Sequence, residues 1–390
     1  MDPDLTSLDE FLREQDVDGY FIEAPATNAD QRYLSGFGSH DPFGTLYTGG
    51  RTHLLVRGLD RGLARRVSRA DTVASPAEYG YREKVERYGS TAAYHRVLAA
   101  FLADHDVESI AVPERFPVGI ADGLRALDVA IVPEADGIVT EIRAVKTDDE
   151  VEHVRTAQRA NERAMERAEE LLRAATIADG VLHHDDEPLT SERIKEEIEL
   201  VLLRHGCALD ETIVASGADA ADPHERGSGP IHANEPIVID IFPRDKETKY
   251  NGDMTRTFVV GEPTETAREW YDLTLEAMDA ALDAIEPGVT GAAVHDAVCD
   301  VYEAAGVPTA RSDETTETGF IHGTGHGVGL DVHELPRVST TGGELEPGHV
   351  ITIEPGVYDP AVGGIRIEDL VVVTAEGYEN LTDYHKRFVI

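Results

Sequence analysis

Apolar residues in the first part of the chain form short clusters that follow the spacing of a strand or of a helix in turn. Four clusters bounded by turn residues predict strands: GYFIEA, THLLVRG, SIAVP and VAIVP. Two stretches with apolar residues every three or four positions predict helices: LTSLDEFLREQDV, with Thr6 or Ser7 as its cap, and YHRVLAAFLADHDV. This succession of strands and helices predicts an α/β domain.

Helical patterns become longer beyond residue 145, and they occur twice. Apolar spacing predicts long helices over about 149–175 and 264–285. Each is followed by a shorter capped helix, bounded by Thr190 and Gly206 in the first copy and, 100 residues further on, by Thr290 and Gly306 in the second. The repeated order of helix, helix and strands predicts an internal duplication.

The change of pattern predicts a domain boundary. We expect residues 1–145 to form the α/β domain and residues 146–390 to form an α+β domain with a pseudo-two-fold axis between its halves. The stretch ADGVLHHDDEPL places two histidines and two aspartates side by side at 183–186, where we expect a solvated acidic loop rather than a metal site. His232 and His349 fall in predicted turns, and we expect both at the surface.

Acidic residues occupy corresponding places in the two copies. Asp240 lies in the apolar strand IVIDIF, and Asp253 follows it 13 residues later. In the second copy Glu354 lies in VITIEPG, and Glu368 follows it 14 residues later. Since the copies are expected to pack about a pseudo-two-fold axis, we expect the four carboxylates to converge.

Convergence of four carboxylates beside apolar residues such as Ile239 requires cations, because buried like charges repel and take up protons. Two divalent ions with bridging carboxylates would neutralise them. Each copy also has one histidine, His224 or His326, and oxygen ligands with a histidine suit Mn²⁺, Co²⁺, Fe²⁺ or Zn²⁺. Alternatively, the acids pair with Arg256 and Arg366, which would account for one or two acids but not for a duplicated pattern.

The charge of the chain is unusual, with 35 Lys and Arg against 75 Asp and Glu and a formal net charge of −40. We favour adaptation to high salt, where screening weakens self-repulsion, over a strongly basic partner. The charge argues against nucleic acid and anionic membranes as partners. The N-terminus lacks an apolar run, no stretch has 18 apolar residues, and the two cysteines, Cys207 and Cys299, are isolated. We therefore expect a reduced, cytoplasmic protein without a signal peptide or transmembrane helix.

Five stretches lie in one order between about 216 and 373: SGADAADPH, VIDIF…NGDMTRTF, GTGHGVGLDVHE, TIEPGVY and GGIRIEDLV. Together they resemble the pita-bread metallopeptidases, a group that includes aminopeptidase P, prolidase, methionine aminopeptidase and the metal-free creatinase. The N-terminal half resembles the creatinase-type N-terminal domain through NADQRYLSGF. Such a domain speaks against a plain methionine aminopeptidase.

The resemblance implies a set of metal ligands, which are Asp240, Asp253, His326, Glu354 and Glu368. Asp240 would bind one ion, His326 and Glu354 the other, and Asp253 and Glu368 would bridge both. Two ions per chain are implied, with Mn²⁺ as the first expectation. Glycines on both sides of His326 are expected to give its backbone clearance to approach a metal ion.

The resemblance also implies which residues face the substrate. His224 and His333 would contact the scissile amide and the tetrahedral intermediate, and Glu354 would accept a proton. Arg366 would support the ligands, because on a strand it shares a face with the residue two positions later. Further members of the site would be His322 and Tyr358.

The resemblance implies a homodimeric Xaa-Pro aminopeptidase or dipeptidase, which hydrolyses the Xaa–Pro bond in short peptides. One segment departs from the family pattern: DIFPRDKETKYNGD is longer than usual, with Phe242 and Pro243 where small residues are typical. We therefore expect a different pocket wall around an unchanged set of ligands. Three alternatives remain: a metal-free creatinase-type amidinohydrolase, another metal-dependent hydrolase or lyase acting on small molecules, and a non-catalytic interaction module.

Overall fold

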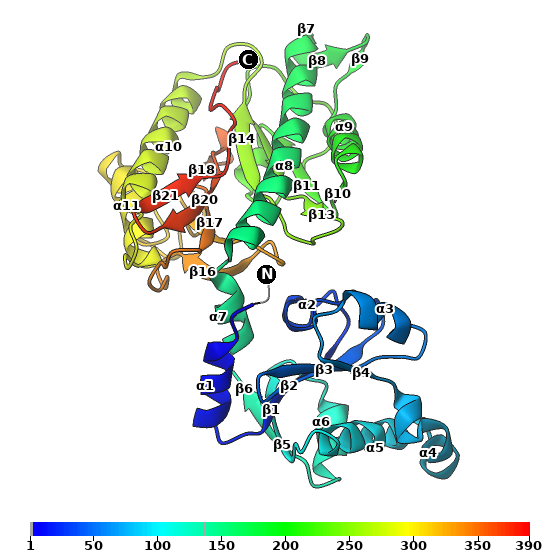
Figure 1. The fold of residues 1–390 in the computed structure, drawn as a ribbon. Coiled ribbons are helices and arrows are strands. Elements are labelled where there is room, and N and C mark those ends of the chain that lie inside the picture. Colours follow the sequence, from blue (N-terminus) through cyan, green and yellow to red (C-terminus); the bar gives the residue numbers. More distant parts are fainter. Residues whose placement is uncertain (1–2, 136) are drawn as a thin grey trace. The chain divides into compact units, whose positions relative to one another are not determined.

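A computed structural model describes residues 3–135 and 137–390 of the chain (Figure 1). The chain forms two compact units, of which one ends at Arg143 and the other begins at Ala144. We call them the N-terminal unit and the C-terminal unit.

The N-terminal unit is an α/β domain built on one six-stranded sheet with the strand order β4-β3-β2-β1-β5-β6. The middle strands β1, β2 and β3 are antiparallel, and β4, β5 and β6 pair in parallel with their neighbours. The strands are β1 (Gly19–Ala24), β2 (Phe43–Thr48), β3 (Arg51–Leu55), β4 (Thr72–Ala74), β5 (Ser109–Pro113) and β6 (Ala130–Glu134). The helices are α1 (Thr6–Glu14), α2 (Ala29–Ser35), α3 (Arg61–Val67), α4 (Tyr81–Tyr88), α5 (Ser90–Ala103), α6 (Val118–Arg125) and α7 (Ile138–Ala144), with one 3₁₀ turn, η1 (Pro76–Tyr79).

The cap predicted for the first helix is wrong. Helix α1 begins at Thr6, and neither Thr6 nor Ser7 caps it. Instead the carboxylate of Asp4 accepts hydrogen bonds from the backbone N–H of Thr6 (3.0 Å) and from its hydroxyl (2.6 Å). A carboxylate suits this position because it carries a full negative charge toward the positive end of the helix dipole.

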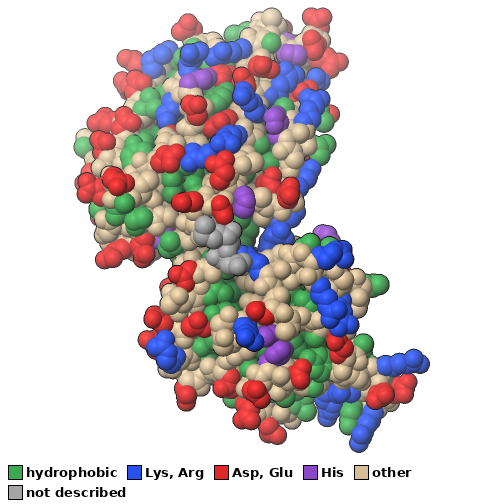
Figure 2. Space-filling view, in the orientation of Figure 1, with side chains coloured by type: hydrophobic (Ala, Val, Ile, Leu, Met, Phe, Trp, Pro, Cys, Tyr) green, Lys and Arg blue, Asp and Glu red, His purple; other side chains and the backbone are tan. Residues whose placement is uncertain are grey.

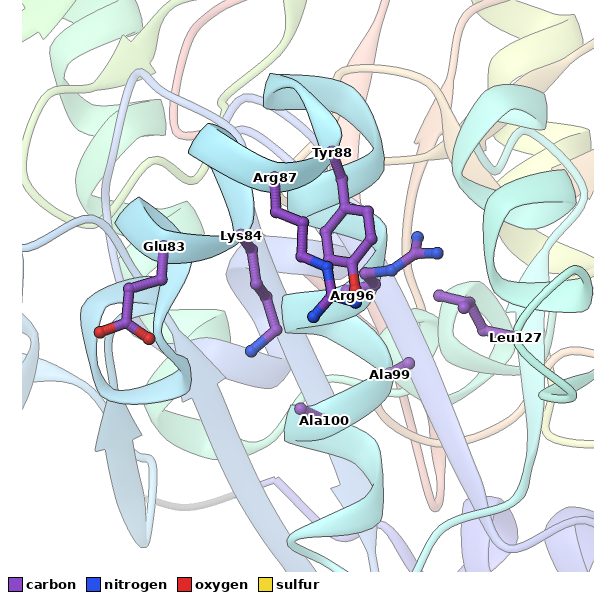
Figure 3. Close-up of a pocket in the computed structure, with 8 residues that line it drawn as sticks. All are labelled: Glu83, Lys84, Arg87, Tyr88, Arg96, Ala99, Ala100 and Leu127. Atoms are coloured by element: carbon purple, nitrogen blue, oxygen red, sulfur yellow. The ribbon is translucent and has the colours of Figure 1, made fainter.

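A hollow between α4 and α5 lies in the N-terminal unit, and no candidate site residue lines it (Figure 3). It has a volume of about 550 Å³, and its lining includes Lys84, Arg87 and Arg96. The guanidinium carbons of Arg87 and Arg96 lie 5.0 and 4.2 Å from the ring centre of Tyr88. Cation–π contact with Tyr88 therefore accounts for the two arginines, and Lys84 Nζ donates to the backbone oxygen of Tyr79.

The C-terminal unit is an α+β domain in which two helix pairs flank the sheets, as Figure 1 shows. The first pair is α8 (Asp148–Ala174) with α9 (Ser191–Arg204), and the second is α10 (Glu265–Asp283) with α11 (Gly291–Ala304). Thr190 and Thr290 cap the shorter helices through bonds from the N–H groups of Arg193 (3.2 Å) and Ala293 (3.1 Å). The predicted duplication of the helix pairs and their caps is confirmed.

Each helix pair covers its own sheet. The first sheet has the order β11-β12-β14 and the second β16-β15-β17-β20-β21. Their strands are β11 (Thr212–Ser216), β12 (Ile237–Ile241), β14 (Met254–Phe258), β15 (Gly325–Gly327), β16 (Glu334–Val338), β17 (Val350–Ile353), β20 (Asp369–Thr374) and β21 (Gly377–Asn380). Leu171, Leu202 and Ile239 belong to one core, and Ala281, Val298 and Ile353 belong to another. The two pairs β10 (Cys207–Ala208) with β13 (Arg244–Asp245) and β18 (Gly356–Asp359) with β19 (Gly363–Arg366) complete the unit, with the 3₁₀ turn η2 (Asp219–Ala221).

Two expectations about histidines need correction. The stretch expected as a loop forms a small sheet of β7 (Thr176–Ala178), β8 (Val181–His184) and β9 (Glu187–Pro188). Asp185 and Asp186 make its turn with positive φ values of 57° and 63°, which aspartate tolerates better than most residues. His349 is buried rather than at the surface, and its Nδ1 accepts a hydrogen bond from the N–H of Glu346 at 3.0 Å. His232 is exposed, as predicted.

The surface of both units carries acidic side chains spread among basic ones, without a single acidic patch on the visible face (Figure 2). Among the described helices, none combines the length and the apolar character that crossing a bilayer requires.

Candidate metal centre

The four candidate carboxylates lie at corresponding strand ends. Asp240 is the fourth residue of β12, and Asp253 directly precedes β14, which is the antiparallel neighbour of β12. In the second sheet Glu354 directly follows β17, and Glu368 directly precedes β20, again its antiparallel neighbour. Because the end of one strand lies beside the start of its antiparallel partner, each sheet brings its own two carboxylates together.

A contact between the sheets brings the two pairs into one cluster. The N–H of Glu368 donates to the backbone oxygen of Thr255 (3.0 Å), and the Thr255 hydroxyl donates to Glu368 Oε2 (2.8 Å). Asp253, His326 and Glu368 have ligand atoms that all lie within 4.8 Å of one another. His326 Nε2 is also 3.5 Å from Glu354 Oε1. Convergence of these residues, predicted from the duplication, is confirmed in the geometry.

Burial gives the carboxylates unusual proton affinities. Asp253 and Glu368 are only 4% and 2% exposed. Burial, and then the charges of neighbouring carboxylates, raise the pKa of both well above their usual range. Burial also raises the pKa of Glu354 to about 8, although Arg366 opposes the shift. Without cations, this cluster therefore retains protons that a bound cation would displace.

His326 is held in the form that binds metals. Its Nδ1 lies 3.1 Å from the backbone oxygen of Gly327 and donates to it, which leaves the lone pair of Nε2 directed toward the carboxylates. Burial lowers the pKa of His326 to about 4, so the ring is neutral at physiological pH. Asp240 Oδ1 is buried and has no hydrogen-bond partner. A neutral imidazole, a free carboxylate oxygen and converging carboxylates fit a divalent metal ion of the first transition row.

The glycines around His326 allow strands to approach, which corrects the expectation that they clear space beside a metal. A Cβ on Gly325 would lie 1.9 Å from the backbone oxygen of Thr352, and one on Gly327 would lie 2.0 Å from that of Leu335. Strand β15 therefore fits between its neighbours β16 and β17 only with glycine at positions 325 and 327. The glycines place His326 by permitting close packing of the backbone.

A hydrogen-bonded chain runs along one side of the cluster from Arg366, which is 4% exposed. Its Nη2 contacts Asp240 Oδ2 at 2.7 Å, and its Nη1 donates to the Tyr358 hydroxyl at 3.0 Å. Tyr358 in turn donates to His322 Nε2 (2.9 Å), because His322 Nδ1 donates to the oxygen of Gly323 (2.7 Å). Burial lowers the pKa of His322 to about 3 and raises that of Tyr358 to about 12, so both groups are neutral.

The alternative that the candidate acids pair with Arg256 and Arg366 holds for only one of the four carboxylates. Arg366 pairs with Asp240. Arg256 pairs with Asp369, which was not a candidate ligand. Arg366 also reaches the Glu368 side indirectly, since its Nε donates to the Thr255 hydroxyl at 3.2 Å.

The other two histidines lie at the exposed side of the cluster. His224 and His333 are exposed, unlike the partly buried His326. The ring of His333 stands edge-on to that of His326, with centroids 4.2 Å apart. Burial and the nearby His224 lower the pKa of His333, although Asp240 opposes the shift. Both rings are thus placed where they can reach a molecule that approaches the carboxylates from solvent.

The long segment between Asp240 and Asp253 forms an additional strand pair. After Phe242 and Pro243 the chain enters β13, which pairs with β10. The segment then returns through Asn251, whose backbone N–H and side-chain Nδ2 both donate to the oxygen of Gly329, at 2.9 and 2.8 Å. The segment therefore packs against the glycine-rich segment that carries His326 and His333.

Sequence reasoning missed Thr255, which joins Glu368 to Arg366. The alternation of side chains along β14 could have revealed it, because Asp253 and Thr255 are two residues apart and share one face. The register agrees, since Thr255 lies opposite Asp240. Sequence reasoning also missed Gln158 on α8, whose side-chain amide contacts the backbone of Asp253. No local pattern marks this residue.

A duplicated α+β domain that converges buried carboxylates and a neutral histidine defines a metal-dependent hydrolytic enzyme of the pita-bread type. Comparison with known proteins agrees. Residues 152–375 match Metallopeptidase family M24, and residues 5–145 match the Creatinase/Prolidase N-terminal domain. The first match covers more than half of the chain, and the chain therefore belongs to metallopeptidase family M24. The resemblance found in the sequence is confirmed, and so is the fold class.

Similar proteins carry Xaa-Pro dipeptidase names. The Xaa-Pro dipeptidase of Pyrococcus horikoshii is 27% identical over 394 residues, which cover 100% of this chain and 99% of that protein. The Xaa-Pro dipeptidase of Pyrococcus furiosus is 35% identical over 251 residues, or 63% of this chain and 65% of that protein. Among solved structures, the prolidase of Pyrococcus horikoshii superimposes with a TM-score of 0.80 at 27% identity, covering 98% of this chain and 99% of that one.

The proton affinities of the cluster predict how the stability of the metal-free protein depends on pH. Glu354 keeps its proton up to about pH 8 in the folded state but only to near its usual pKa of 4.5 in the unfolded chain. Its stabilising contribution is complete below that usual pKa and is lost as the pH rises through about 8. We expect the unfolding midpoint of chelator-treated protein to fall between pH 5 and pH 8.5. Thermal unfolding measures this, with Glu354→Gln as the control that should show a smaller fall; a midpoint that rises over this range contradicts the account.

Proposed function

We propose that this chain hydrolyses the Xaa–Pro bond of short peptides with two divalent metal ions, of which Mn²⁺ is the first candidate. The proposed ligands are Asp240, Asp253, His326, Glu354 and Glu368. The observation that carries the proposal is the single cluster in which buried carboxylates meet the unprotonated Nε2 of His326. Relatives named Xaa-Pro dipeptidase support the choice of substrate.

Two bound ions would act as Lewis acids and lower the pKa of a water molecule. Glu354 is suited to accept the proton of that water, because its carboxylate lies within the cluster, with Oε1 3.5 Å from His326 Nε2. His333 stabilises the developing negative charge on the carbonyl oxygen by hydrogen bonding. His224 hydrogen-bonds to the peptide at the scissile amide. Both imidazoles reach the peptide because they lie on the exposed side of the cluster.

Arg366, Tyr358 and His322 keep the site in one protonation state. Arg366 compensates the charge of Asp240, which is 14% exposed in its side chain, and fixes its Oδ2. That contact leaves Asp240 Oδ1, which has no hydrogen-bond partner, available to bind a metal ion. The neutral Tyr358–His322 pair extends the hydrogen bonds of Arg366 beside the site without adding charge. The proposal includes a homodimer and activity in high salt. The molar mass measured by light scattering in molar salt tests the homodimer.

The fully assembled cluster favours this proposal over the alternatives. A metal-free amidinohydrolase or a non-catalytic module has no need of four converging carboxylates, of which Asp253, Glu354 and Glu368 have pKa values raised by burial. Another small-molecule hydrolase or lyase would use the same ligands and differ in the pocket. The insertion through Phe242 and Pro243 is the part of the chain where such a difference would arise.

A matched pair of dipeptides tests the substrate. We expect Ala-Pro to be hydrolysed faster than Ala-Ala by the Mn²⁺-treated protein in high salt, and short Xaa-Pro peptides to be preferred over proteins. Product amino acids quantified by chromatography give the rates, with a longer Xaa-Pro peptide assayed beside them. Equal or faster hydrolysis of Ala-Ala would remove the proline assignment and leave a dinuclear metallopeptidase of other specificity.

A further inference from the structure

We propose that two buried side chains outside the metal centre, Gln158 and Arg256, position the carboxylates of Asp253 and Glu368 through a shared C-terminal segment. We call this segment, residues 382–386, the C-terminal strap. The inference rests on the proposed function, in which Asp253 and Glu368 bridge the two ions. Neither Gln158 nor Arg256 reaches the reacting atoms, so both are positioning residues.

Gln158 holds the backbone of Asp253 at both of its polar groups. Its Oε1 accepts from the Asp253 N–H and its Nε2 donates to the Asp253 carbonyl, each at 2.9 Å. Gln158 lies on α8 and is fully buried. A Cβ on Gly252 would lie 2.8 Å from Gln158 Oε1, so the glycine before Asp253 permits this approach. The side-chain amide therefore fixes the residue just before β14, where the pairing of that strand with β12 stops.

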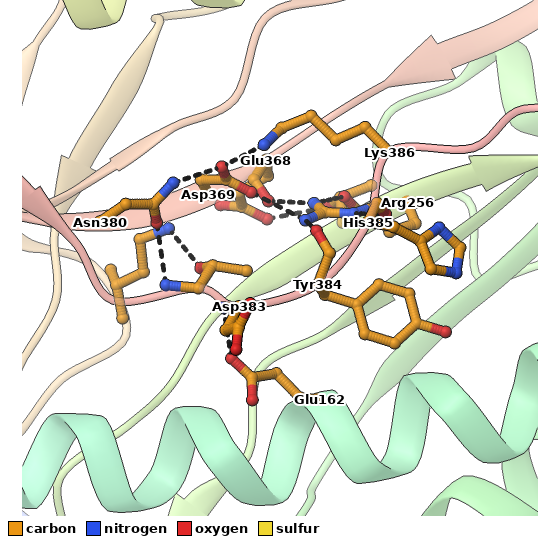
Figure 4. Close-up of polar contacts among 12 residues, drawn as sticks. Glu162, Arg256, Glu368, Asp369, Asn380, Asp383, Tyr384, His385 and Lys386 are labelled. Carbon is orange, nitrogen blue, oxygen red and sulfur yellow. Dashed lines mark hydrogen bonds and ion pairs between the residues drawn. The ribbon is translucent and has the colours of Figure 1, made fainter.

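Arg256 holds the backbone of Glu368 from the other side (Figure 4). It is fully buried, and all five of its N–H groups donate. Nη1 donates to the oxygens of Glu368 (2.6 Å) and Thr255 (2.9 Å). Nη2 donates to Asp369 Oδ1 (2.8 Å) and the Tyr384 oxygen (2.9 Å), and Nε donates to the His385 oxygen (3.0 Å). Two of these five acceptors belong to the strap.

The C-terminal strap connects the hydrogen bonds of Gln158 with those of Arg256. The hydroxyl of Thr382 accepts from Gln158 Nε2 at 2.8 Å and from the N–H of Leu370 at 2.9 Å. At its other end, Lys386 Nζ contacts Asp369 Oδ2 at 2.5 Å, and Figure 4 shows Asn380 on the same carboxylate. Displacing the strap would therefore remove partners from Gln158 and Arg256 together, and with them the supports of both bridging carboxylates.

Such a network should act on metal affinity because a bridging carboxylate must serve two ions at fixed separation. Buried polar groups without partners are costly, so the network has one fully bonded arrangement. Residues that orient metal ligands from outside typically change metal affinity by about 10- to 100-fold when replaced. An effect confined to folding would not single out the metal centre.

A pair of glutamine variants tests the inference. Gln158→Met keeps the length of the side chain and removes its hydrogen bonds. Gln31→Met is the matched control, because Gln31 is equally buried and its Nε2 donates to the oxygens of Ala24 and Phe43 in the N-terminal unit. Calorimetric titration of the metal-free proteins with Mn²⁺ should show affinity about 10- to 100-fold weaker for Gln158→Met and unchanged for Gln31→Met. The electron paramagnetic resonance spectrum should lose the signature of coupled Mn²⁺ pairs in Gln158→Met alone.

Two milder variants decide the matter if Gln158→Met does not fold. Thr382→Val keeps the side-chain volume and removes the shared acceptor, and Arg256→Lys keeps the charge with fewer donors. Both should bind Mn²⁺ more weakly than the wild type. Wild-type affinity in a folded Gln158→Met protein, equal losses in both glutamine variants, or unchanged affinity in both milder variants would overturn the inference. A wild-type chain that binds no Mn²⁺ would instead refute the proposed function.

Discussion

Asp253→Asn should abolish peptide hydrolysis and release most of the bound metal. Asp253 is one of the two proposed bridging ligands, so its replacement would remove a charged ligand from both ions. Turnover should fall by more than the ~10²–10³ that follows the loss of one electrostatic group. Metal analysis of the purified variant beside an assay on Ala-Pro measures both effects.

The control for this variant is Glu23→Gln. Glu23 is a buried carboxylate of the N-terminal unit, 7% exposed, and it is bonded to the Tyr94 hydroxyl. Burial raises its pKa to about 7, as burial raises those of the cluster. The Glu23→Gln variant should keep its metal, because the loss of a buried carboxylate in the other unit leaves the proposed ligands in place. Two tightly held metals per chain in Asp253→Asn would show that Asp253 is not a bridging ligand.

His326→Ala and His333→Ala should separate metal binding from catalysis. His326 directs an unprotonated Nε2 at the carboxylates from 3.5 Å, so its removal should weaken metal binding. His333 is exposed beside it, so its removal should leave the metal bound and lower kcat by roughly 10²–10³. Metal titration and steady-state kinetics on both variants test this, with the exposed His232→Ala as the control. Equal loss of metal in the two variants would show that the roles are wrongly divided.

The duplication made the carboxylates predictable from the sequence. The similar spacing of Asp240 and Asp253 in one copy and of Glu354 and Glu368 in the other, 13 and 14 residues, reflects equivalent strand ends, and the ends of paired strands meet. The long helices, and the shorter helices with their threonine caps, were predictable for a related reason, since both depend on residues close in sequence. Local patterns therefore accounted for these helices and for the positions of the candidate carboxylates.

Features that depend on distant contacts were not predictable. His349 lies in a turn by its local sequence, yet tertiary packing buries it. Gln158 contacts Asp253 from a helix 95 residues away, and no spacing in the chain encodes that contact. The Gly–His–Gly stretch was recognised as special, but its reason, the approach of backbone oxygens from two other strands, became visible only in three dimensions.

Titration of the metal-free protein with Mn²⁺, followed by hydrolysis of Ala-Pro in high salt, tests the central claim most directly. The protein is treated with a chelator and dialysed, and bound metal and activity are then measured in the same samples. The account predicts no hydrolysis without metal and activity that rises until two ions are bound per chain. Hydrolysis of Ala-Pro by the metal-free protein, or none after two ions are bound, would contradict it.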